Sequence, residues 1–163
     1  MLAILLLLGL AACQEEGKTT AGAGSPGASD SDVALNCRRE LPDPPLAAEN
    51  KARLTLTIAD LGHEIVDGRN RYPHSRSFAE ANGVPVTIYR GKVCVENGAE
   101  CADACVSYRI AGGTTLVQAN HHVATKADRD RITLHYWARD DGGNFHELNR
   151  VVETDGTRAA VAD

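Results

Sequence analysis

Apolar and polar residues alternate with a period of two through much of the chain, which is typical of half-buried β-strands. The clearest run is 53–59, where Leu54, Leu56 and Ile58 alternate with two threonines. Turn-forming residues separate this run from the next ones, with Gly112-Gly113 and 140–144 as the strongest turn signals. Further strands are predicted at 84–90, 92–96, 105–111, 114–118, 131–138 and 145–153.

Helical signals are few by comparison. The longest helix candidate lies around 75–82, where Gly83 and Pro85 would end it. Six or seven short strands with regular turns favour an all-β fold, an antiparallel β-sandwich.

The stretch 132–144 resembles the end of bacterial immunoglobulin-like repeats, which carry a Tyr in the penultimate strand and an Asp-x-x-Gly-Asn turn before the last one. The residues that match are Tyr136, Asp140, Gly143 and Asn144. The resemblance implies an immunoglobulin-like sandwich. In it the half-buried Tyr closes the core, and Asp, Gly and Asn supply the positive-φ positions of the turn.

A second resemblance lies at the N-terminus. Residues 2–8 are an unbroken apolar run, and Leu10-Ala11-Ala12-Cys13 is similar to the lipobox of bacterial lipoproteins. The resemblance implies cleavage after Ala12 and a lipid on Cys13, with acyl chains that anchor the protein to a membrane. Gln14 in place of Asp implies sorting to the outer membrane, facing the periplasm.

The remainder of the chain divides by composition. Small and acidic residues fill 14–32, and such a segment predicts a flexible tether because it has no large apolar side chain to bury. We therefore expect a signal peptide at 1–12, a lipidated linker at 13–32, an immunoglobulin-like domain at 33–158 and a flexible tail at 159–163.

Net charge restricts the partners. The 163 residues carry 17 basic and 22 acidic side chains, a formal charge of −5. A nucleic-acid binder needs a basic patch to displace counterions from phosphates, so no nucleic-acid partner is expected.

The cysteines predict disulfides. Apart from Cys13, the chain has Cys37, Cys94, Cys101 and Cys105. An even number in an exported domain indicates two bridges, with three possible connectivities. One is expected to hold the segment around Cys37 to the domain and the other to close the loop after Cys94.

The sequence offers no catalytic set. His63-Glu64-Ile65-Val66-Asp67 begins like the HExxH zinc motif but has Asp at the second ligand position, and glycines flank it. No GxSxG elbow is present, and disulfides would leave no nucleophilic thiol. We expect neither an enzyme nor a cofactor.

Histidines are the remaining candidates for metal chemistry. Zinc or copper sites use imidazole ligands, and the candidates here are His121, His122, His135 and His146, with His63 and His74 elsewhere in the chain. Adjacent His121 and His122 should point to opposite sides of a strand. His135 and His146 should likewise lie on opposite faces of the last hairpin, because Leu148 shares a face with His146.

Trp137 and His135 are the candidate binding surface. In the expected register both point away from the apolar face of 131–138. An outward Trp is a typical hot spot of a protein interface. It is equally compatible with cover from a loop or from the 37–83 segment.

The sequence therefore predicts an anchored binding module whose partner is another envelope or secreted protein. Inhibitor, immunity and assembly-accessory lipoproteins share its layout of anchor, tether and small domain. A periplasmic zinc- or copper-binding lipoprotein is the alternative.

Overall fold

The computed structural model describes residues 30–39, 41 and 50–162. The lipobox, Cys13 and most of the predicted tether therefore lie outside the described residues. One helix, α1 (Asp30–Arg39), precedes the strands of the described part, and a short 3₁₀ turn, η1 (Glu96–Gly98), follows β4. The strands are β1 (Leu54–Ala59), β2 (Glu64–Val66), β3 (Arg69–Glu80), β4 (Val86–Val95), β5 (Glu100–Ile110), β6 (Thr115–Thr125), β7 (Arg129–Asp140), β8 (Phe145–Asp155) and β9 (Ala159–Val161).

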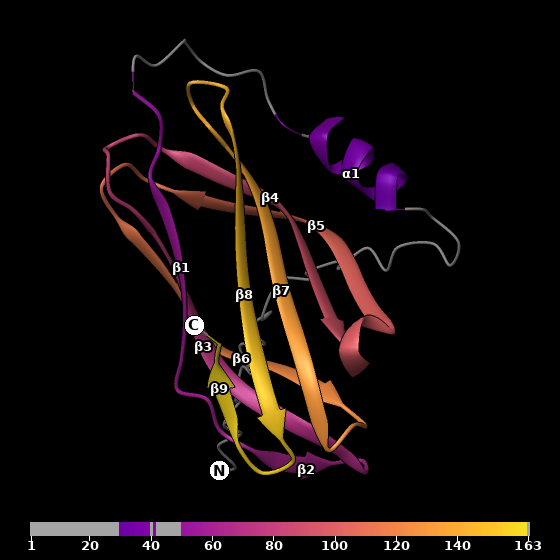
Figure 1. Ribbon diagram of the computed structural model, residues 1–163. Coiled ribbons are helices and arrows are strands. Elements are labelled where there is room, and N and C mark those ends of the chain that lie inside the picture. The colour runs from indigo at the N-terminus through magenta and orange to yellow at the C-terminus, as the bar shows by residue number, and fades with distance from the viewer. Residues whose placement is uncertain (1–29, 40, 42–49, 163) are drawn as a thin grey trace, which may run out of the picture.

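These strands form two antiparallel sheets packed face to face (Figure 1). In sheet A, β3 is central: β1 and β2 pair along one side and β6 along the other. Sheet B has the order β5-β4-β7-β8-β9. The predicted immunoglobulin-like antiparallel β-sandwich is confirmed.

The core lies between the sheets and follows the alternation of the strands. In β7 the predicted apolar face is fully buried, with Ile132, Leu134, Tyr136 and Ala138 all at most 2% exposed. These side chains pack with Phe78 and Leu56 of sheet A. The ring of Phe78 meets that of Tyr136 edge to face at 5.1 Å between centroids, a favourable aromatic geometry.

The helix predicted at 75–82 is wrong, because these residues belong to β3 and the turn after it. The core-facing positions of β3 are Tyr72, His74, Arg76, Phe78 and Glu80, and three of these five are His, Arg or Glu. Charged side chains thus conceal the period-two pattern in the sequence. Pairing with β1 and β6 on both sides determines the strand.

Two predicted boundaries also differ from the structure. Residues 159–161, expected in a flexible tail, form β9 and pair with β8. Residues 30–32, expected at the end of the tether, begin α1.

The disulfides are Cys37–Cys105 and Cys94–Cys101. The first joins α1 to β5 and holds the helix beside β4 and β5 (Figure 1). The second links directly paired residues of β4 and β5 across the short loop that contains η1. The expected roles, one bridge for the N-terminal segment and one for the loop, are therefore confirmed, and the structure supplies the connectivity.

Candidate functional site

Trp137 and His135 lie on the outer face of sheet B, as the alternation of β7 predicts. Their rings stack with centroids 3.9 Å apart. On the neighbouring strands, Arg90 is the cross-strand partner of Trp137 in β4, and Glu147 is its partner in β8. We call Trp137, His135, Arg90 and Glu147 the outer-face cluster.

The outer-face cluster is held by charge and by stacking. The Arg90 guanidinium lies 4.1 Å from the Trp137 ring centroid, a cation–π contact, and forms a largely buried ion pair with Asp103 of β5. Glu147 accepts a hydrogen bond from Trp137 Nε1 at 3.2 Å and lies 3.4 Å from His135 Nε2. Trp137 is half-buried, so its ring is fixed in position while part of it stays accessible.

A β-bulge explains how Arg90 reaches this face. The register between β4 and its neighbours shifts between Ile88 and Arg90. The extra residue lets Tyr89 and Arg90, adjacent in sequence, both leave the core side. Tyr89 contacts Phe145 and accepts a hydrogen bond from Arg38 of α1 at 3.3 Å. The alternation of hydrophobicity alone does not indicate such a bulge.

The metal-site candidates of the sequence do not come together. His135 is on the outer face of sheet B, and His146 lies on the inner face, where its Nε2 is 2.9 Å from Asp140 Oδ2. His122 is outside sheet A against Arg71, and His121 points between the sheets toward His74. Within 30–39, 41 and 50–162, no three His, Cys, Asp or Glu side chains are grouped to hold a metal ion.

A second bulge determines which histidine faces the interior. The register between β3 and β6 shifts between His74 and Arg76, and Asn120 of β6 has a left-handed φ of 61°. The bulge makes His121 the partner of His74 on the inner face and leaves His122 outside. Burial and the nearby Arg76 charge lower the pKa of His121, and burial above all lowers the pKa of His74.

The sequence did not indicate the group of polar side chains around Arg76, which lies between the sheets and is 8% exposed. Arg76 Nε donates to Gln118 at 2.7 Å, Nη1 to the Tyr136 hydroxyl at 2.5 Å and Nη2 to the Tyr108 hydroxyl at 3.1 Å. We call Arg76, Gln118, Tyr108, Tyr136 and His121 the interior cluster. Its only signal in the sequence is a charge at a core-facing position of β3.

Two buried carboxylates close one end of the sandwich. Glu80 accepts hydrogen bonds from five backbone N–H groups, those of Arg53, Asn82, Gly83, Val84 and Gly113. Burial alone would raise the pKa of Glu80, but these bonds lower it to about 2.

Asp140 is the second of these carboxylates. It accepts bonds from Ala52 N and from the backbone and side chain of Asn144, as well as from His146. Burial opposes ionisation, but these bonds hold the pKa of Asp140 below its usual value. Of the three turn residues matched to the immunoglobulin-like repeats, only Gly143 has a positive φ. Asp140 acts through its carboxylate instead.

A cavity of about 400 Å³ lies beside the edge strands β5 and β6. Its walls are mainly apolar, with Val93 and Val95 of β4, Ala102 of β5, and Val123 and Ala124 of β6, and the lining also contains Glu100, Cys101 and His122. The cavity thus lies between the β4–β5 end of sheet B and β6 of sheet A, and in the described part of the chain no backbone pairing joins β5 to β6.

The fold is similar to that of a solved structure. A crystal structure of a Bordetella pertussis protein assigned as ApaA superposes with a TM-score of 0.50 at 8% identity, covering 72% of this chain and 95% of that one. The structural-genomics target SoR45 gives 0.48 at 8% identity, covering 71% and 88%. No family model and no curated protein matches the sequence. At this identity the likeness concerns the fold alone.

Proposed function

We propose that this protein is a lipoprotein anchored to the outer membrane, whose immunoglobulin-like domain binds another protein of the envelope or a secreted protein. The anchor rests on the lipobox at Leu10-Ala11-Ala12-Cys13. Among the described residues, no helix is long and apolar enough to span a membrane. An acylated Cys13 would supply the attachment.

The outer-face cluster carries the proposal of a binding function. Trp, Tyr and Arg dominate protein–protein hot spots because they offer large contact areas with defined geometry. Here Trp137 is fixed by His135 and Arg90 before any partner arrives, which lowers the entropic cost of binding. Phe145, 54% exposed, extends the aromatic surface on the same side of β8.

The binding test uses the fact that Trp137 is the only tryptophan of the chain. We expect a protein captured from native envelopes to change the intrinsic fluorescence of Trp137. Trp137→Ala and Phe145→Ala should each weaken capture about tenfold or more, as hot-spot truncations do. The matched control is Val117→Ala, which removes a 64% exposed side chain from the edge strand β6 of sheet A.

Equal capture by Trp137→Ala, Phe145→Ala and Val117→Ala would remove the outer-face cluster from the proposal. The anchor is tested separately, by incorporation of labelled palmitate and recovery in the outer-membrane fraction. The Cys13→Ser variant should take up no labelled palmitate and should be absent from the outer-membrane fraction. A wild-type chain that takes up no label would contradict the anchor and leave the binding test standing.

A further inference from the structure

Arg76 is a buried cation that no carboxylate neutralises in the described part of the chain. Its three hydrogen-bond acceptors are an amide oxygen and two phenol oxygens, all neutral. Tyr136 remains a neutral phenol, because burial raises its pKa. The rings of Phe78, Tyr108 and Tyr136 lie 5.3 to 5.9 Å from the guanidinium and offset part of the desolvation cost. A full counter-charge is still missing, and buried charges are normally paired.

Arg76 also has N–H donors without an acceptor among the described residues. A guanidinium carries five N–H groups in a fixed fork suited to carboxylates. The structure gives three of these groups acceptors, one on each nitrogen. Two N–H groups remain for an incoming oxyanion.

The interior cluster is reached from the seam between β5 and β6. Its partly exposed members, Tyr108, Gln118 and His121, all come from these two edge strands, whereas Tyr136 is buried. Because β5 and β6 belong to different sheets, no backbone ladder closes the seam between them.

The apolar cavity continues the same seam. Val123, in its wall, is two residues from His121, and Val93 is two residues from Gly91, the partner of Tyr136. Two residues of a strand span about 6.6 Å. At Gly91 an added Cβ would lie 3.0 Å from the Tyr136 ring, so the glycine makes room for this Tyr. The wall of the cavity therefore begins about 6.6 Å along β6 from His121 and about 6.6 Å along β4 from Gly91.

We propose that the seam between β5 and β6 binds a small organic carboxylate, with its carboxylate on Arg76 and its apolar body in the cavity. His121, beside the guanidinium, becomes a second donor when the anion is bound. This site is independent of the outer-face cluster, which lies on the opposite face of sheet B.

The experiment titrates the full-length chain with acetate, butyrate, hexanoate and benzoate, and with benzyl alcohol as an uncharged probe. Binding is followed through the ring NMR signals of His121 and His74. We expect saturable binding that tightens with apolar length, weaker binding of benzyl alcohol than of benzoate by about tenfold, and a raised His121 pKa in the complex.

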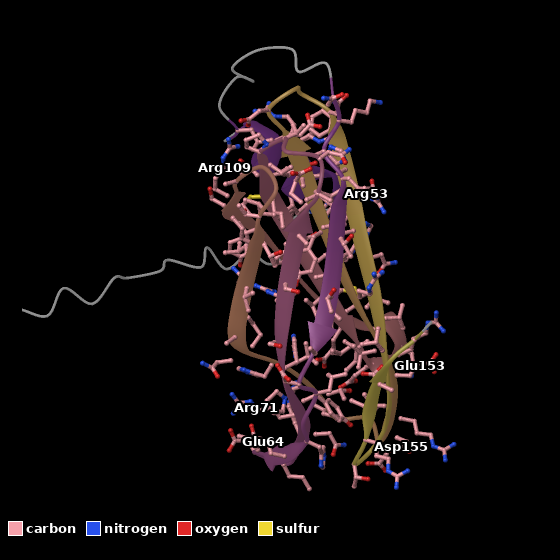
Figure 2. All side chains as sticks on the ribbon, turned by 90° about the vertical axis from the view of Figure 1, so that its left-hand side faces the viewer. Arg53, Glu64, Arg71, Arg109, Glu153 and Asp155 are labelled. Atoms are coloured by element: carbon pink, nitrogen blue, oxygen red, sulfur yellow. A yellow bond between two sulfur atoms is a disulfide. The ribbon has the colours of Figure 1, made fainter. Side chains whose placement is uncertain are left out.

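Three variants test the assignment. Arg76→Gln should weaken hexanoate and benzoate at least about tenfold. The matched control is Arg109→Gln, an exposed arginine of β5 that pairs with Asp141 at 2.5 Å and does not line the cavity, and binding should be unchanged (Figure 2). Val95→Phe, which fills the cavity and keeps Arg76, should weaken hexanoate and spare acetate. It keeps the test valid even if Arg76→Gln fails to fold.

Three outcomes would overturn the proposal. The first is that no carboxylate of the series binds saturably. The second is that benzyl alcohol binds as tightly as benzoate, which would make the cavity a general apolar site. The third is that a folded Arg76→Gln retains wild-type affinity, which would make Arg76 a structural residue only.

Discussion

Two buried charges of β3, Arg76 and Glu80, lie four residues apart on the same face of the strand, at 8% and 3% exposure, and the fold treats them differently. Five backbone N–H groups from three separate segments surround the Glu80 carboxylate. Among the described residues, Arg76 contacts neutral oxygens and aromatic rings and no carboxylate. Burial of a charged side chain therefore does not by itself define its role in the protein. The role depends on the groups that surround and neutralise the charge.

Glu80 is a structural centre. Its carboxylate accepts hydrogen bonds from N–H groups at the start of β1, in the turn after β3 and in the Gly112-Gly113 turn between β5 and β6, and so joins these three segments. Each of these backbone N–H groups would otherwise need water or another acceptor. Arg76 binds no comparable set of backbone groups in the described part of the chain. An anionic ligand would supply the counter-charge that its guanidinium lacks there.

The largest effect is expected from Glu80→Ala. Removing the carboxylate leaves several backbone donors without an acceptor, and the free energy of unfolding should fall by about 3 to 4 kcal/mol. Urea unfolding at neutral pH measures the change. Glu153→Ala, at an exposed site of β8 (Figure 2), should cost no more than about 0.5 kcal/mol. A loss for Glu80→Ala as small as that would remove the contrast between the two charges.

Acid should act on Glu80 in a defined window. Its pKa is about 2 in the fold against 4.5 ordinarily, so the unfolded chain binds the proton first. The contribution of its charge is therefore fully present above pH 4.5 and declines as the pH falls toward about 2. Unfolding free energies of wild type and Glu80→Gln, measured across this window, should converge on acidification. A difference independent of pH would show that the charge of Glu80 does not stabilise the fold.

Arg76→Met should destabilise the fold much less than Glu80→Ala. The substitution keeps an unbranched side chain of similar length and removes a buried charge, so the free energy of unfolding without ligand should change by about 1 kcal/mol or less. Urea unfolding beside Glu80→Ala makes the comparison direct. A loss as large as that of Glu80→Ala would make Arg76 a structural residue like Glu80 and would remove the energetic reason for a ligand.

Part of the outer-face cluster and of the interior cluster could be predicted from the sequence. The alternation in 131–138 is regular, so the inward Tyr136 and the outward Trp137 and His135 follow from the period of two. In β3 the same reasoning failed because His, Arg and Glu occupy core-facing positions. Hydropathy registers such a strand as polar, and only its pairing partners reveal it.

The sequence by itself determined the sandwich, the apolar face of β7 and the even set of cysteines, because these depend on local periodicity and composition. The tertiary structure decided the disulfide pairing, the inward turn of His121 and the outward position of Arg90. The last two depend on bulges that shift a register by one residue, and such a shift exchanges the two faces of a strand. It also decided that Glu80 is surrounded by backbone N–H donors, whereas Arg76 meets no carboxylate within 30–39, 41 and 50–162, since the partners of both come from distant strands and turns.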